Sequence, residues 1–243
     1  MDYSFLQCGE GALTVHLGDG IDPAINRRVT ALQGAIGSAG LRGITDLIPA
    51  YADLTVCYDC TVISAKALQR QLRRLLDSLS VAGQDRRRVF QLPVCYGGDY
   101  GPDLDFVCHH SGLSAQEVIA LHSAPDYLIY MLGFLPGFAY LGGLDPRLHT
   151  PRLDSPRTCI PAGSVGIGGA QTGVYPLASP GGWQLLGRTP LSVFDRQRQE
   201  PILYRAGDLV HFVPISPAEY EEIARAVAAG TYTVQVEEVP VCD

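Results

Sequence analysis

The chain has 243 residues, of which 47% are apolar and 18% charged, and its formal net charge at pH 7 is −7. This composition supports a buried core and excludes an intrinsically disordered chain. The negative charge argues against a nucleic-acid-binding surface. Lys66 is the only lysine among 18 basic residues. A P-loop, which needs a lysine after its glycine-rich turn, is therefore excluded.

Targeting and metal-binding patterns are absent from the sequence, and we expect a cytoplasmic protein. The first residues, MDYSFLQCGEGAL, lack the basic and long apolar regions of a secretory signal. The run 127–144 is uncharged, but its glycines and proline predict a buried strand and a turn rather than a membrane span. Cys57-x-x-Cys60 has no second pair to complete a zinc site, so we expect no metal ligands.

The first part of the chain alternates strands and helices. We expect a helix over 22–38, since Asp22 is a typical N-cap and Pro23 suits the first helical position. The other expected elements are a strand over 12–17, strands over 44–50 and 54–58, a helix over 64–79 with Ser64 as its N-cap, and a strand over 89–96. This order, β-α-β-β-α-β, predicts a small α+β sandwich, ferredoxin-like or related, over residues 1–88.

The run Arg86-Arg87-Arg88 lies at the predicted boundary between the two domains. We interpret it as a solvated turn, and a patch for docking a partner is the alternative.

The second domain is predicted over residues 89–243 and is mainly β. A glycine-rich turn over 97–103 precedes a short helix, and a capping box of Ser114 and Glu117 begins a second helix that ends near 123. From residue 127 onward, short apolar runs alternate with glycine and proline turns, which is typical of a barrel or sandwich. A strand over 209–214, a helix over 216–229 and a strand over 232–239 complete the chain.

Three blocks rich in glycine, proline and aromatic residues stand out in this second domain. They are GFLPGFAYLGGL at 133–144, PAGSVGIGGAQTGVYP at 161–176 and SPGGWQLLGRTP at 179–190. Such blocks specify rigid irregular turns, on which proteins build pockets. We expect structural turns at Gly133, Pro136, Gly137, Gly181 and Gly182.

The three blocks, the second of them taken from Pro156 onward as PRTCIPAGSVGIGGAQTGVYP, resemble the signature of the family of 5-oxoprolinase B subunits. This family is also called allophanate hydrolase subunit 1 or the Kip-type (KipI) kinase inhibitor family. The resemblance covers roughly residues 93–215 and implies a cyclophilin-like β-barrel. It also implies one component of an ATP-dependent 5-oxoprolinase, a hydrolase which opens 5-oxoproline to glutamate. Its implied partners in this hetero-oligomer are a homologous C subunit and a separate A subunit. The chain has no recognised nucleotide loop, so we expect ATP at a site shared with a partner and little activity from the isolated chain.

Two other functions stay open within this resemblance. Kip-type relatives are described as inhibitors of a sensor histidine kinase, which would make the site a protein-contact surface. Relatives of urea carboxylase would make the chain half of a carboxyltransferase, with biotin supplied by another protein. Self-association through exposed sheet edges is a further possibility.

A small anionic substrate is the ligand that the candidate site residues suit best. Arg152, Arg157 and Arg188 lie in or beside the blocks, and a guanidinium binds carboxylates or phosphates in a bidentate manner. The alternative is that each arginine ties a loop to backbone carbonyls. The remaining candidates for binding are Ser164, Gln171, Thr172, Tyr175 and Trp183.

His122 is the candidate for general acid–base catalysis, because the resembled family has a histidine at this motif position. Alternatively it is a histidine at a helix C-terminus that meets free carbonyls. Ser164 sits in a near match to the G-x-S-x-G elbow, but Ala162 replaces the first glycine and no helix pattern follows, which disfavours a serine hydrolase. The glycines over 166–173 leave a backbone nest for an anion open.

Overall fold

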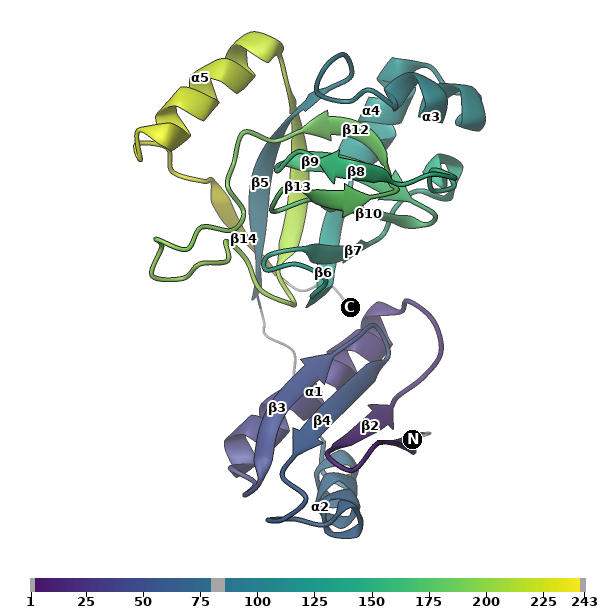
Figure 1. The fold of residues 1–243 in the computed structure, drawn as a ribbon, viewed down its shortest axis with the longest axis vertical. Coiled ribbons are helices and arrows are strands. Elements are labelled where there is room, and N and C mark those ends of the chain that lie inside the picture. Colours follow the sequence, from purple (N-terminus) through teal and green to yellow (C-terminus); the bar gives the residue numbers. More distant parts are fainter. Residues whose placement is uncertain (1–2, 80–85, 241–243) are drawn as a thin grey trace. The chain divides into compact units, whose positions relative to one another are not determined.

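The computed structural model describes residues 3–79 and 86–240, and the chain divides into two compact units at the boundary before Arg86 (Figure 1). The first unit is an α+β sandwich and the second is mainly β. This architecture confirms the predicted fold class.

Within residues 3–79, four strands form an antiparallel sheet in the order β1-β2-β4-β3. They are β1 (Ser4–Cys8), β2 (Ala12–His16), β3 (Ile44–Pro49) and β4 (Asp53–Tyr58). Two helices, α1 (Pro23–Ala39) and α2 (Ala65–Asp77), pack on one face through a buried aliphatic core. The predicted caps are confirmed, since the Asp22 carboxylate accepts a hydrogen bond from the Ala24 N–H and the Ser64 hydroxyl accepts one from Ala67.

One element of the first sheet differs from the prediction. The strand expected over 89–96 belongs to the second unit, and its place in the first sheet is taken by β1, which sequence reasoning missed. Most side chains of β1 are exposed, so it lacks the alternation of apolar and polar residues that marks a half-buried strand.

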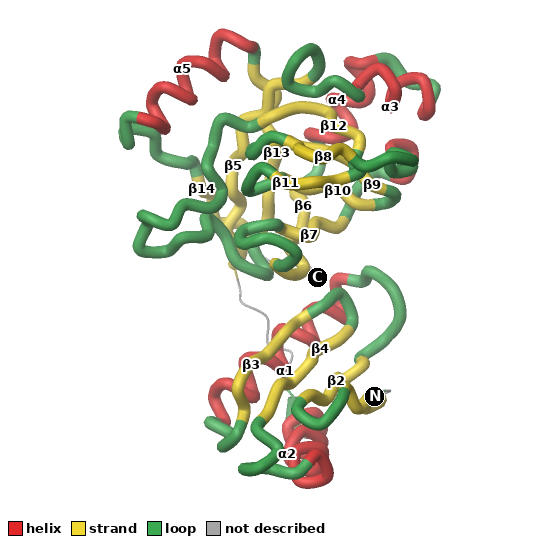
Figure 2. The backbone as a smooth tube through the Cα atoms, viewed as in Figure 1, coloured by secondary structure: helices red, strands yellow, loops and turns green. Residues whose placement is uncertain are grey.

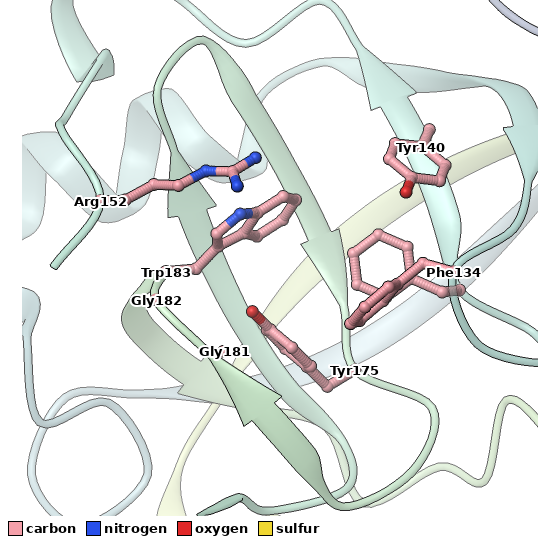
Figure 3. Close-up of a pocket in the computed structure, with 8 residues that line it drawn as sticks. Phe134, Tyr140, Arg152, Tyr175, Gly181, Gly182 and Trp183 are labelled. Atoms are coloured by element: carbon pink, nitrogen blue, oxygen red, sulfur yellow. The ribbon is translucent and has the colours of Figure 1, made fainter. Parts of the chain in front are cut away.

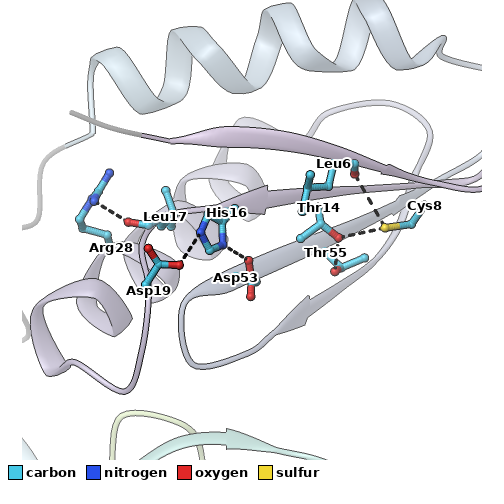
Figure 4. A network of polar contacts seen from close by, with 9 residues as sticks. All are labelled: Leu6, Cys8, Thr14, His16, Leu17, Asp19, Arg28, Asp53 and Thr55. Carbon is cyan, nitrogen blue, oxygen red and sulfur yellow. Dashed lines mark hydrogen bonds and ion pairs between the residues drawn. The ribbon is translucent and has the colours of Figure 1, made fainter.

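The other face of this sheet carries polar contacts between neighbouring strands (Figure 4). His16 Nδ1 lies 2.8 Å from Asp53 Oδ1, and the hydroxyls of Thr14 and Thr55 lie 2.8 Å apart. The hydrogen bond with Asp53 raises the pKa of His16. These pairs face each other across β2 and β4, so they fix the register of the two central strands.

Within residues 86–240, eight strands form one mixed sheet that closes on itself (Figure 2). The order is β12-β9-β10-β7-β6-β13-β5-β14, and a further pairing of β12 with β5 closes a barrel of the first seven strands. The strands are β5 (Arg86–Tyr96), β6 (Asp126–Leu132), β7 (Ala139–Gly142), β9 (Ser164–Gly168), β10 (Gln171–Val174), β12 (Gln184–Arg188), β13 (Leu209–Ile215) and β14 (Val236–Pro240). The last of these begins four residues later than the predicted strand.

Helices and a small ribbon accompany the barrel. The helices are α3 (Leu104–Ser111), α4 (Ala115–Ser123), α5 (Pro217–Ala228) and the short 3₁₀ turn η1 (Pro146–Leu148). The predicted capping box is confirmed, because Ser114 and Glu117 bond each other's backbone N–H groups. Strands β8 (Arg157–Ile160) and β11 (Ser179–Gly181) pair as a separate ribbon. Over the residues described, no helix combines the length and apolar character needed to cross a bilayer.

The arginine run at the start of the second unit is a strand and not the turn that we predicted. Arg86 to Arg88 begin β5 and pair with residues 238–240 of β14. The Arg88 guanidinium forms two hydrogen bonds, of 3.0 and 2.6 Å, with the buried carboxylate of Asp208. Pairing with β14, which lies far along the chain, supplies hydrogen bonds that the local sequence does not reveal.

The barrel wall separates two apolar clusters, and this separation positions the site. Residues such as Val165, Ile167 and Leu186 belong to the large core inside the barrel. Phe138, Ile160, Tyr175, Trp183 and Leu185 form a second cluster on the other side of the wall. Successive residues of a strand point to opposite faces, so neighbouring residues such as Leu185 and Leu186 of β12 belong to different clusters.

Candidate functional site

An aromatic pocket of about 130 Å³ lies on the outer side of the barrel wall (Figure 3). It is lined by Phe134, Phe138, Tyr140, Arg152, Tyr175, Gly181, Gly182 and Trp183. The three glycine-rich blocks and the segment around Arg152 all contribute, so residues far apart in the sequence form one hollow. A cavity of this size suits a ligand smaller than a typical drug molecule.

Phe138 is the centre of the pocket's aromatic wall. Its ring centroid lies 5.2 Å from Tyr140, 5.5 Å from Trp183 and 5.6 Å from Tyr175. All three contacts are edge-to-face, the geometry in which the positive edge of one ring meets the negative face of another. The wall is therefore a rigid set of rings in mutual contact, and it includes Tyr175 and Trp183, two of the residues predicted for binding.

Phe134 stands at the rim of the pocket in a backbone conformation that is rare for a residue with a side chain. Its φ is +65° and 66% of its surface is exposed. The Leu135 N–H donates to the Gly133 carbonyl at 2.8 Å, and Gly137 has a φ of +83°. The expected turn at Gly133, Pro136 and Gly137 thus presents an aromatic ring to solvent beside the cavity, at a strain of about 1–3 kcal/mol.

Arg152 supplies a positive charge at the pocket. Its guanidinium carbon lies 6.0 Å from the centroid of the Trp183 ring, within reach of a cation–π contact. Among residues 3–79 and 86–240, no carboxylate forms an ion pair with it. Burial raises the pKa of Tyr175, while the charges of Arg152 and Arg157 act in the opposite direction. Arg152 and Arg157 therefore both contribute positive charge near the Tyr175 hydroxyl, although burial outweighs their effect on its pKa.

Two glycines under the indole ring make room for Trp183. A methyl group on Gly168 would overlap the indole nitrogen, and a methyl group on Gly173 would lie 3.2 Å from the ring carbon Cζ3. Both glycines lie in the paired strands β9 and β10. From the sequence, a backbone site for an anion was considered at these glycines. Nothing in the sequence indicated that they make room for the indole ring of Trp183.

Known proteins are similar to this chain over most of its length. Residues 3–204 match the family described as carboxyltransferase domain, subdomain C and D. A protein of Bacillus subtilis (strain 168) named as the B subunit of 5-oxoprolinase is 42% identical over 228 residues, which cover 90% of this chain and 95% of the relative. A protein of Escherichia coli O157:H7 with the same name is 46% identical over 207 residues, covering 85% and 93%. This chain belongs to the family of 5-oxoprolinase B subunits.

A solved structure gives the same fold in a longer protein. The crystal structure of TTHA0988 matches with a TM-score of 0.75 and 40% sequence identity. The match covers 84% of this chain but only 40% of that one. In that protein, the region similar to this chain is accompanied by further polypeptide.

Arg157 does not line the pocket and binds a carboxylate of the protein itself. Its Nη2 lies 2.7 Å from Asp103 Oδ1, and its Nη1 donates weakly to the Trp183 carbonyl at 3.4 Å. The second oxygen of Asp103 accepts the Leu185 N–H at 2.7 Å. Asp103 therefore joins the start of α3 to both Arg157 and β12. The sequence did not indicate the pairing of Arg157 with Asp103, because the two residues are 54 positions apart.

Replacing Arg157 by Ala is expected to destabilise the second unit by about 2 kcal/mol, because the carboxylate of Asp103 loses its charged partner. Chemical denaturation followed by Trp183 fluorescence measures the change. The double variant D103N/R157A is the control: it leaves no unpaired charge and should recover part of the loss. A single variant as stable as the wild type would contradict the structural role of this pair.

Three further candidates lie away from the pocket lining. The Arg188 Nε donates to the Ala162 carbonyl at 3.0 Å, which is the loop-tying alternative considered for each arginine. Ser164 is buried, and its carbonyl accepts the Tyr175 N–H at 2.9 Å. Gln171 begins β10 on the same side of the wall as Gly173. The pocket thus gathers Arg152, Tyr175 and Trp183 with the turn glycines Gly181 and Gly182, but not Arg188.

His122 and Thr172 lie inside the barrel and are fully buried. His122 Nδ1 lies 2.8 Å from the Tyr96 hydroxyl, and Nε2 lies 2.8 Å from the Thr172 hydroxyl. Desolvation lowers the pKa of His122 to about 3, so the imidazole is neutral near pH 7. His122 does not line the pocket, and its assignment to proton transfer stays a prediction. In the described parts of the chain, no three histidine, cysteine or acidic side chains form a metal-binding group.

The buried imidazole predicts a specific loss of stability in acid. The unfolded chain gains a proton on His122 below about pH 6.5, whereas the folded chain stays neutral there until about pH 3. Stability is therefore full above pH 6.5 and falls between these values, by up to about 1.4 kcal/mol per pH unit. Denaturant unfolding of the wild type and His122→Gln over this range measures the effect. Parallel curves for the two proteins would contradict it.

Proposed function

We propose that this chain is the B subunit of an ATP-dependent 5-oxoprolinase and that its aromatic pocket holds 5-oxoproline. The substrate is a small lactam ring that carries one carboxylate. The flat ring suits a cavity walled by Phe138, Tyr140 and Trp183, and the carboxylate suits the guanidinium of Arg152. One observation carries the proposal: Arg152 lines this small aromatic pocket and, among the described residues, has no carboxylate partner.

The same residues do not fit a nucleoside triphosphate. The pocket measures about 130 Å³, its described lining contains one arginine, and Lys66, the only lysine, lies in the first unit. Binding of transferable phosphates needs several cationic or backbone donors around the phosphate oxygens. We therefore place ATP at a site completed by a partner, and we expect the isolated chain to bind substrate but not to turn it over.

A longer relative supports the need for a partner. In TTHA0988, the matching region makes up 40% of the chain, so it occurs there next to further polypeptide. The partners proposed for this chain are the C and A subunits of the same enzyme, and the proposed location is the cytoplasm.

Trp183 is the only tryptophan in the chain and lines the pocket, so its fluorescence reports ligand binding directly. We expect 5-oxoproline to change its emission in a saturable manner. The ligand 2-pyrrolidinone, a lactam ring without a carboxylate, is the matched control and should bind much more weakly. Equal responses to the two ligands, or no response to either, would remove this pocket as the substrate site.

Turnover is tested separately with the assembled enzyme. The chain is combined with the C and A subunits, and 5-oxoproline-dependent ATP hydrolysis is measured. A well-folded complex without activity would contradict the 5-oxoprolinase function and favour kinase inhibition. The family match to a carboxyltransferase domain supports one other candidate, which is tested by carboxyl transfer from a biotinylated carrier protein to urea.

A further inference from the structure

The buried contacts of His122 leave a single arrangement of protons. The Thr172 hydroxyl lies 3.0 Å from the Gly166 carbonyl, which only accepts, so the hydroxyl proton is directed to it. The same hydroxyl oxygen must then accept from His122 Nε2–H. This tautomer leaves Nδ1 without a proton, so Nδ1 accepts from the Tyr96 hydroxyl.

The imidazole is also fixed by its apolar surroundings. It stacks on the Phe212 ring with a centroid distance of 4.8 Å and an interplanar angle of 18°. The titratable groups that face it, Tyr96 and Tyr127, both have pKa values raised by burial. The Tyr127 hydroxyl donates to the His122 carbonyl at 2.8 Å, so the backbone of His122 is held as well as its ring.

These hydrogen bonds fix the position of β10, the strand that contacts Trp183 through Gly173. Thr172 and Gly173 are neighbours in β10 and face opposite sides of the barrel wall, Thr172 toward His122 and Gly173 toward the indole. Thr172 also pairs with Ile167 of β9. The residue after Ile167 is Gly168, and a methyl group on its Cα would overlap the indole nitrogen of Trp183. A shift of Thr172 therefore moves both glycines that support Trp183.

We propose that His122 is a positioning residue: it holds the hairpin of β9 and β10 in the register that seats Trp183 in the pocket, and it exchanges no proton with the substrate. The effect on substrate rests on the proposed function, because it assumes that the pocket is the binding site. The effect on Trp183 itself does not, since it exists without ligand.

The test compares His122→Gln with His122→Leu. Glutamine keeps one acceptor and one donor and can bond both Tyr96 and Thr172, whereas leucine removes both hydrogen bonds at similar bulk. We expect H122Q to keep the wild-type emission of Trp183, and H122L to shift it toward that of a solvated indole. In the assembled enzyme, H122L should raise KM for 5-oxoproline by about tenfold. H122Q should keep the kcat and the pH profile of the wild type.

Thr172→Val and Thr172→Ser provide a second route in case H122L does not fold. Serine keeps the hydroxyl, so T172S should retain the emission of Trp183. Valine removes the hydroxyl and should reproduce the shift seen in H122L. Since both changes break the same bond, the effects of H122L and T172V should not add.

Proton transfer by His122 would give a different pattern. Both H122Q and H122L would then lose kcat, the pH profile would lose an inflection, and the ligand-free emission of Trp183 would stay unchanged. That result overturns the proposal. Absence of 5-oxoproline binding to the wild type, together with the expected emission shifts in H122L and T172V, would contradict the proposed function but support the positioning role.

Discussion

Replacing Arg152 by Ala is expected to weaken 5-oxoproline binding by about 10- to 100-fold, the loss typical of a hydrogen-bonded charged partner. The physical reason is that, among the described residues, Arg152 is the one cation lining the pocket, and the aromatic rings around it offer no other group that neutralises a carboxylate. Titration of Trp183 fluorescence measures the affinity, and the assembled enzyme should show a matching loss of kcat/KM.

Two controls separate recognition of the carboxylate from general loss of charge. Arg152→Lys keeps the charge but not the planar fork, so it should bind with an intermediate affinity. Arg196→Ala removes an exposed arginine of the same unit that does not line the pocket, and it should bind as the wild type does. Binding that is unchanged in Arg152→Ala, or reduced equally in Arg196→Ala, would show that Arg152 is not the carboxylate partner.

Replacing Gly168 by Ala is expected to abolish the pocket while the barrel still folds. The added methyl group would overlap the indole nitrogen of Trp183, and the ring is held by Phe138 and Tyr175 at centroid distances of 5.5 and 6.0 Å. The indole must therefore leave its seat, at a cost of about 1–3 kcal/mol for overpacking. We expect a red-shifted emission of Trp183 and no saturable response to 5-oxoproline.

Gly182→Ala is the matched control for this substitution. Gly182 also lines the pocket, but the nearest atom to an added methyl group lies 3.7 Å away, an ordinary contact. Its variant should keep the emission and the binding of the wild type. If Gly168→Ala behaved like Gly182→Ala, the position of the indole ring would not depend on the absence of a side chain at Gly168.

Local sequence signals predicted the helices well. Asp22, Ser64 and Ser114 are identifiable as caps from residue type and spacing alone, and each lies where predicted. A helix cap is satisfied by residues two or three positions away, so its evidence is contained in the sequence. The family is recognisable in the same way, because the blocks of glycine, proline and aromatic residues are contiguous.

Two segments were predicted wrongly for different reasons. Strand β1 was missed because its mostly exposed side chains give no apolar–polar alternation, although its partner β2 is the next strand in the chain. The prediction of a turn at Arg86 to Arg88 was wrong because this segment pairs with β14, about 150 residues further along the chain. A segment that is stabilised by distant strands need not carry a strong propensity or pattern of its own.

By itself, the sequence determined the fold class, the family and the region that contains the pocket, since each follows from the order of local elements and from motifs that are contiguous in the chain. Tertiary structure alone decided which arginine reaches the pocket, that Arg157 binds Asp103, and that His122 and Thr172 face the barrel interior. The physical reason is that each of these contacts joins residues far apart in the chain, which only the folded backbone brings together. For Thr172 in β10, the alternation of strand side chains between the two sides of the wall decides as well. Which side a residue takes depends on strand register, and the register is set by pairings between residues far apart in the sequence.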